Sequence, residues 1–271
     1  MGTTGNRKAG ARDRGLKIGR VGKDLRRTEG IVVLLLLAGA VTAVAQTAER
    51  AGAGGGDGAV DPVARVRSNR SWEYGPFLNW GSGIGDRSNY KFFWGGFELG
   101  KVLTPVVHAG ILSGQFQLAG NIMPLWQAYT PPPHLEEYQC QTTNGQTIGC
   151  LLPFGGGTFR GVSITPVIFR WNFVSHSRRI QPWFQGAGGV IYTTHEFPPN
   201  LMSNPSEEID GSTSVWNFSP QGGIGVHYFL KPKRSIDVGL NAIHISSASL
   251  GDRNPGVNAG LLIQVGYTFW R

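Results

Sequence analysis

From Trp72 to the end of the chain, apolar and polar residues alternate with a period of two, which is the pattern of half-buried β-strands. The segment VWNFSPQGGIGVHYFL at 215–230 is the clearest case. Its even positions are mostly apolar or aromatic, as at Trp216 and Tyr228, whereas its odd positions are mostly small or polar, as at Asn217. The pattern therefore predicts strands with one apolar face and one small or polar face.

Eight segments follow this pattern. They are residues 72–81, 90–103, 113–128, 157–173, 180–195, 213–230, 234–247 and 256–270. In the fourth segment the apolar parity changes at Thr165-Pro166. A β-bulge explains such a change, and proline is tolerated at a bulge because its nitrogen donates no ladder hydrogen bond.

An even number of strands with one apolar face fits a barrel in a membrane, with the apolar faces toward lipid and a small, polar lumen. The alternative, a soluble sandwich, would bury the apolar faces against each other. Aromatic residues gather near the ends of the apolar faces, as in interfacial girdles. The connections alternate between short and long, like periplasmic turns and outer loops. We therefore predict an all-β fold, an eight-stranded antiparallel transmembrane β-barrel, over residues 69–271.

The N-terminal part has a different character. Residues 31–45, IVVLLLLAGAVTAVA, form an apolar run with basic residues before it and Ala43-Val44-Ala45 at its end. This arrangement predicts that residues 1–45 are a cleaved signal peptide with a basic N-region. The run is shorter than the ~20 residues of a spanning helix, and a short N-terminal membrane anchor is the alternative. Residues 46–68 are predicted to be a flexible linker.

The net charge of +8 comes mostly from this N-terminal part. Residues 1–45 carry +6, and the rest of the chain carries +2. No nucleic-acid partner is therefore expected, although the isoelectric point is about 9.8. Charged residues make up 15 % of the chain, against ~25 % in soluble domains, which agrees with a membrane barrel.

One pair of residues on the apolar face is a candidate catalytic pair. His244 and Ser246 continue the lipid-facing row of the seventh segment, near the end that the loop lengths place outside. Residues two apart on a strand point the same way, about 6.6 Å apart along the backbone, so the imidazole can reach the hydroxyl. A His base beside a Ser nucleophile is the minimal pair for acyl transfer. The alternative is that both residues simply lie in the polar headgroup zone.

The motif HISSASLGDRNPG at 244–256, with the signal peptide and the eight segments, resembles the outer-membrane lipid A 3-O-deacylases, the PagL-like group of acyloxyacyl hydrolases. The resemblance implies a carboxylic ester hydrolase of the bacterial outer membrane that removes the 3-O-linked acyl chain of lipid A in lipopolysaccharide. It makes Ser246 the nucleophile and His244 the general base. The other histidines lack metal-ligand spacing, so neither a metal nor another cofactor is expected.

The chain departs from the family at two positions. The family has a Glu about twelve residues after the nucleophile, where this chain has Asn258. Asn258 can orient an imidazole through a hydrogen bond, although strand parity puts it on the lumen face, and Asp252 is a substitute acid. The family's Asn after the nucleophile is Ser247 here. We expect Ser247 and the backbone N–H groups around Ala248 to supply the oxyanion hole.

Cys140 and Cys150 lie in the longest outer connection, on either side of Asn144-Gly145, a pair that favours a tight hairpin turn. In an oxidising compartment the two thiols are expected to form a structural disulfide. The alternative is a metal or redox pair, for which neighbouring ligands are lacking.

Two other functions stay open. A catalytically silent structural or adhesive outer-membrane barrel fits the missing Glu and the long outer loops. A small pore fits less well, because side chains such as Glu98 and His227 would fill the lumen of an eight-stranded barrel. The partners expected are lipid A or lipopolysaccharide in the outer leaflet and the outer membrane itself, with a homodimer left open.

Overall fold

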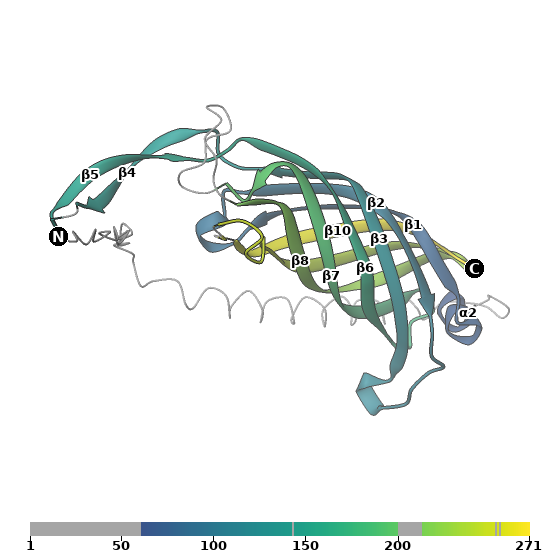
Figure 1. The fold of residues 1–271 in the computed structure, drawn as a ribbon. Coiled ribbons are helices and arrows are strands. Elements are labelled where there is room, and N and C mark those ends of the chain that lie inside the picture. The colour runs from purple at the N-terminus through teal and green to yellow at the C-terminus, as the bar shows by residue number, and fades with distance from the viewer. Residues whose placement is uncertain (1–60, 143, 200–212, 253, 255) are drawn as a thin grey trace, which may run out of the picture.

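The computed structural model describes residues 61–142, 144–199, 213–252, 254 and 256–271. The expected signal peptide and the linker up to residue 60 lie outside them. Most of the described chain forms one closed antiparallel barrel, in the order β1-β10-β9-β8-β7-β6-β3-β2 (Figure 1). The predicted eight-stranded antiparallel β-barrel is confirmed.

The barrel strands lie close to the predicted segments. They are β1 (Trp72–Gly83), β2 (Lys91–Val102), β3 (Gly114–Tyr129), β6 (Thr158–Phe173), β7 (Ile180–Phe197), β8 (Ser214–Lys231), β9 (Arg234–Ile245) and β10 (Val257–Trp270). Two more strands, β4 (His134–Gln141) and β5 (Thr147–Phe154), form a hairpin that extends beyond one end of the barrel (Figure 1). We call this end the hairpin end.

The apolar faces of the strands point outward. Trp216 and Phe218 are exposed on the wall, whereas Asn217 between them is buried inside. The parity change at Thr165-Pro166 is a bulge, since the pairing of β6 with both of its neighbours shifts register there. An exterior of this kind suits contact with lipid, because an outer-membrane barrel turns its apolar band toward the hydrocarbon.

Near the hairpin end the lumen is apolar, which corrects the expectation of a small, polar lumen throughout. The core consists of Phe77, Tyr90, Phe92, Trp94, Met123, Trp126, Ala128, Phe159, Ile191, Phe197, Ile243, Ile245 and Leu262. Trp94 and Trp126 stack with ring centroids 5.9 Å apart. The physical reason is that an eight-stranded barrel must be filled by its own side chains, and large rings fill it where both strand faces are apolar.

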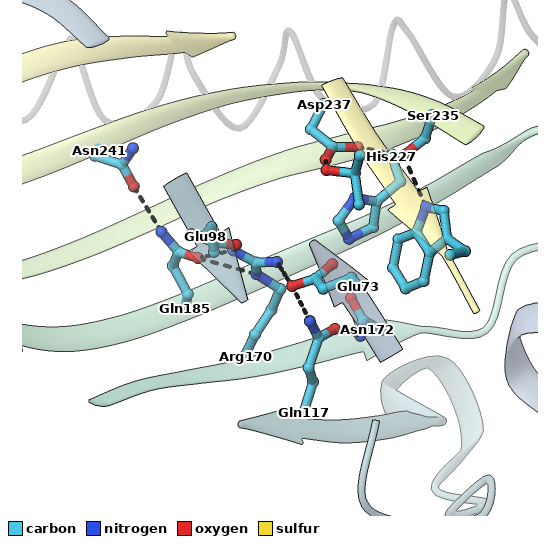
Figure 2. A network of polar contacts seen from close by, with 12 residues as sticks. Glu73, Glu98, Gln117, Arg170, Asn172, Gln185, His227, Ser235, Asp237 and Asn241 are labelled. Carbon is cyan, nitrogen blue, oxygen red and sulfur yellow. Dashed lines mark hydrogen bonds and ion pairs between the residues drawn. The ribbon is translucent and has the colours of Figure 1, made fainter. Parts of the chain in front are cut away.

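The other half of the lumen holds a polar network (Figure 2). Arg170 lies between two carboxylates, 2.7 Å from Glu73 and 2.6 Å from Glu98, and it also donates to Gln185 Oε1. Hydrogen bonds extend this group to Gln117, Asn172, Asn241 and Gln264. A second group joins His227, Ser235, Thr268 and Trp270 around Asp237. These side chains fill the lumen with paired polar groups, as burial of charge requires.

A short helix, α2 (Pro62–Asn69), closes the end opposite the hairpin (Figure 1). Asp61 caps it, because its Oδ1 accepts a hydrogen bond of 3.0 Å from the N–H of Ala64. Val63 and Val66, three residues apart on one helix face, are buried in the barrel mouth. The prediction of a flexible linker is therefore wrong from residue 61 onward. No helix in the described residues is long and apolar enough to cross a membrane.

Candidate functional site

His244 and Ser246 lie on the outer wall of the barrel, at the hairpin end. Ser246 continues β9 through a bridge to β8, in which Phe218 N–H donates to Ser246 O at 2.8 Å and Ser246 N–H donates to Phe218 O at 3.1 Å. Ile243 and Ile245 are buried in the lumen core, and His244 and Ser246 alternate with them and are partly exposed. Both polar side chains therefore belong to the exterior face, as strand parity predicts.

The chain turns sharply after Ser246. Ala248 and Ser249 have φ angles of 48° and 66°, in the left-handed region that is costly for residues with a Cβ. The turn brings the N–H of Ala248 to 3.3 Å from Ser246 Oγ, to which it donates. Backbone N–H groups beside a nucleophilic oxygen are suited to an acyl-transfer oxyanion, which forms next to that oxygen.

Ser247 is withdrawn from the exterior. It is fully buried, its Oγ has no hydrogen-bond partner among the described residues, and its N–H donates to Asn254 Oδ1 at 3.1 Å. This geometry argues against the expected role of Ser247 as an oxyanion donor. Ala248 is the backbone donor that faces Ser246 Oγ.

Asn254 and Gly256 shape the site, and sequence reasoning did not single them out. Gly256 has a φ of 59° and is buried against the pair. A Cβ at this position would lie 3.5 Å from His244 Cε1 and 3.8 Å from Ser246 Cβ. The available signal was the Asn-Pro-Gly run at 254–256, which is typical of a turn with special backbone angles.

β10 has a bulge opposite His244. Val257 pairs with Ile245 and Gly260 pairs with Ile243, so that Asn258 and Ala259 both lie opposite one residue. The two-residue alternation breaks there, and strand parity no longer assigns Asn258 to the lumen face. The side chain of Asn258 is outside the described part of the structure.

Asp252, the substitute acid of the sequence analysis, is exposed in the loop between β9 and β10. Its carboxylate forms no hydrogen bond or ion pair within the described residues. The structure therefore brings His244, Ser246 and Ala248 together, and it gives Asp252 no partner in that group.

An apolar hollow of about 380 Å³ lies on the same outer wall. Its lining comes from three adjacent strands and includes Val162, Ile164, Val190, Tyr192 and Trp216. Trp216 stands two residues before Phe218, the residue that pairs with Ser246. The hollow thus begins on the strand next to Ser246 and opens on the same outer face of the barrel.

A second set of Ser, His and Asp lies in the lumen. His227 and Ser235 each contact the carboxylate of Asp237 at 2.7 Å, so the carboxylate stands between the serine and the imidazole. Both side chains are fully buried, which excludes a substrate. This set is structural. The described residues also contain no cluster of three or more His, Cys, Asp or Glu that could hold a metal ion.

The hairpin contains both cysteines. Cys150 is disulfide-bonded, and Cys140 is the other cysteine of the chain. In the β4–β5 pairing, Cys140 lies opposite Ile148 and Cys150 lies opposite Tyr138. The connecting turn places Gly145 at a φ of 78°, a conformation that glycine adopts at low cost.

A family profile described as lipid A 3-O-deacylase (PagL) matches residues 125–268. The chain belongs to the PagL family. The matched range contains β4 to β9, the loop after β9 and β10 as far as Thr268, and hence every residue of the site described above. Membership of the PagL family confirms the resemblance read from the 244–256 motif.

Several solved structures are also similar to this chain. The crystal structure of the outer membrane enzyme PagL has a TM-score of 0.40 and 14 % identity, covering 71 % of this chain and 98 % of that one. The crystal structure of the outer membrane protein OprG from Pseudomonas aeruginosa has a TM-score of 0.35 and 9 % identity, covering 74 % and 95 %. The solution structure of E. coli outer membrane protein W has a TM-score of 0.30 and 8 % identity, covering 73 % and 96 %. Among curated protein sequences there is no match.

Proposed function

We propose that this PagL family member is an outer-membrane enzyme that hydrolyses the 3-O-linked acyl ester of lipid A by a Ser–His mechanism. The carrying observation is the placement of Ser246 on the lipid-facing wall, with its Oγ 3.3 Å from the N–H of Ala248 and with His244 on the same face. An ester in the outer leaflet meets the barrel wall and never the lumen. Catalytic groups on the exterior therefore suit a lipid substrate.

The reaction follows from the roles of three groups. His244 accepts the proton of Ser246 while Oγ attacks the ester carbonyl carbon. The carbonyl oxygen becomes an oxyanion, which the N–H of Ala248 stabilises. The bond to the sugar oxygen then breaks, and His244 returns the proton to that oxygen. Water attacks the acyl-Ser246 ester by the same route and releases the fatty acid.

We assign to Asn258 the role of orienting His244. Bulges next to active sites re-aim side chains, and the bulge in β10 sets Asn258 and Ala259 opposite His244. An amide can hold an imidazole by a hydrogen bond, but it supplies no negative charge to the imidazolium that forms during attack. We therefore expect slower turnover than a Glu at this position would support. Asp252 is the second candidate.

The apolar hollow is proposed to hold the acyl chain during the reaction. Trp216 and Tyr192 provide aromatic walls, and Val162 and Ile164 provide aliphatic ones. Burial of methylene groups against such surfaces contributes roughly 0.8 kcal/mol per group in water, and less in competition with lipid tails. The hollow is therefore expected to select chain length and position, and its aromatic walls are expected to contribute a modest part of the affinity for the acyl chain.

This function fixes the orientation of the barrel. The hairpin end faces outward with the site in the outer leaflet, and the α2 end faces the periplasm. Export by the N-terminal signal peptide belongs to the same proposal.

The test is mass spectrometry of lipid A from cells that express the wild type, Ser246→Ala or Ser88→Ala. Ser88 is an exposed serine between β1 and β2, at the same end of the barrel, and serves as the matched control. We expect loss of one 3-linked hydroxyacyl group with the wild type and with Ser88→Ala, and no loss with Ser246→Ala. If all three folded proteins gave unmodified lipid A, the catalytically silent barrel would be the better reading.

A further inference from the structure

We propose that the α2 end of the barrel is a docking surface for the anionic headgroups of phospholipids in the periplasmic leaflet. The orientation that it uses rests on the proposed function, while the surface itself is defined by charge and exposure. It consists of the α2 segment, the β2–β3 connection at 103–113 and the two short turns at 174–179 and 232–233.

Exposed cations crowd this end. Arg65 and Arg70 are exposed beside α2, and Arg178 and Arg179 are exposed in the β6–β7 turn. The β8–β9 turn adds Lys231, Lys233 and Arg234, all exposed.

Carboxylates do not neutralise these cations. Asp61 is the one acidic side chain of the described α2 segment and connections at this end, and it caps α2. Glu73, Glu98 and Asp237 point into the lumen and are already paired there (Figure 2). The outer rim of this end is therefore strongly positive, and it attracts anions over about a Debye length.

The rim contains a hollow with two guanidinium groups. A space of about 340 Å³ is lined by Ala64, Arg67, Ser68 and Arg70 from α2 and its end, and by Pro105 and Val106 from the β2–β3 connection. Arginine binds phosphate through two parallel hydrogen bonds. A phosphodiester fits between these groups, with Pro105 and Val106 beside the glycerol portion.

Exposed apolar side chains at this end favour a lipid over an acidic protein as the partner of the surface. In the β2–β3 connection, Ile111 is 96 % exposed, and Leu112 and Val107 are also exposed. The connection extends sideways from the barrel (Figure 1), which is the direction in which a membrane surrounds a barrel. An acidic polypeptide would satisfy the arginines and leave this apolar loop in water.

Two cations of this end lie over exterior aromatic rings. Lys101 Nζ is 5.0 Å from the ring centre of Trp72, and Arg234 Cζ is 5.6 Å from that of Phe269. Aromatic rings of this kind concentrate at the headgroup level of membrane proteins. The cations are thus at the depth where phosphates lie.

The experiment titrates the purified full-length chain in detergent with phosphatidylglycerol or phosphatidylcholine and counts bound lipids by native mass spectrometry. We expect phosphatidylglycerol to bind at least ten times more tightly. A Lys or Arg near an anionic surface contributes about five-fold in affinity, so Arg67→Gln/Arg70→Gln should lose roughly twenty-five-fold. The control pair Lys91→Gln/Arg160→Gln, at the hairpin end, should lose less than two-fold.

Equal binding of the two lipids would overturn the proposal, and so would equal losses in the α2 and control pairs. Preferential loss of lipid A binding in Arg67→Gln/Arg70→Gln would also overturn it, because this end would then face outward. If that variant failed to fold, Arg178→Gln/Arg179→Gln on an exposed turn should still weaken phosphatidylglycerol binding. Ser246→Ala should keep the lipid preference whether or not the wild type deacylates lipid A, so the two proposals can fail separately.

Discussion

The backbone N–H of Ala248 donates a hydrogen bond of 3.3 Å to Oγ of Ser246. The donor reaches this position because Ala248 and Ser249 both adopt left-handed backbone angles. Strain of this type costs on the order of 1–3 kcal/mol per residue, and the bridge to Phe218 and the Asn254 contact hold the turn in place. In the proposed mechanism, the nucleophile and its oxyanion donor are therefore preorganised before substrate arrives.

Asn258→Glu is expected to raise the deacylation rate at least tenfold, since a carboxylate stabilises the imidazolium of His244 better than an amide does. Asn258→Ala should lower the rate. Initial rates of fatty-acid release from lipid A in mixed micelles provide the measurement. Asn144→Glu, in the exposed hairpin turn, introduces the same charge at a distance and should leave the rate unchanged. A rate that did not rise would move the orienting role to Asp252, and Asp252→Asn would then be the variant to test.

Gly256→Val is expected to reduce the rate by about a hundred-fold, because a displacement of about 1 Å at reacting groups has an effect of that size. The new side chain would press on His244 Cε1, which lies 3.5 Å from an ideal Cβ. Gly145 also has a positive φ, but open space surrounds its Cβ position. Gly145→Val therefore carries the backbone strain alone and should keep full activity. Similar losses in both variants would show that backbone strain, and not contact with His244, is responsible.

Trp216→Ala is expected to lower kcat/KM by about tenfold, mainly through KM, since it removes acyl-chain contacts made equally in the ground and transition states. Lipid A species of different acyl length should also be cleaved more evenly. Trp72 is the matched control, because it is 48 % exposed against 49 % for Trp216 and lies at the α2 end. Equal effects of Trp72→Ala and Trp216→Ala would mean that the hollow does not bind the reacting chain.

Arg170→Met is expected to lower the free energy of unfolding by about 3–5 kcal/mol, because it leaves Glu73 and Glu98 in the lumen without a counter-charge. Urea unfolding in lipid vesicles, followed by tryptophan fluorescence, measures the change. The triple variant Glu73→Gln/Glu98→Gln/Arg170→Met removes all three charges and should recover most of the loss. If the triple variant were as unstable as Arg170→Met, packing of the long side chain would be the dominant contribution.

The strands of the barrel could be predicted because apolar residues recur at every second position on the face that points outward. The apolar half of the lumen could not be predicted. Phe92 and Trp94 share a strand face with Glu98 further along β2, and a two-residue period does not show how deep in the lumen each residue lies. Likewise, Val63 and Val66 in a Gly- and Ala-rich stretch do not by themselves predict a buried helix face. Their burial depends on the barrel mouth, which forms from distant strands.

Within the site, the pair His244 and Ser246 could be predicted from parity and from the family motif. The bulge at Asn258 could not, because it lies at the first residues of β10, where too few alternating positions precede it to show a change of parity. The burial of Ser247 follows from alternation, but its engagement with Asn254 depends on the path of the loop. The contribution of Gly256 depends on the backbone angles of the turn, which the sequence alone does not give.

The helix α2 precedes the first strand, yet Val63 and Val66 pack with Trp270, the last residue of β10, as well as with Val102 and Phe229. These contacts span the seam where β1 meets β10. The helix therefore has no complete docking place until the final strand has joined the first. We therefore expect the helix to dock only after the barrel has closed, and protection of residues 61–70 from a protease should then report closure.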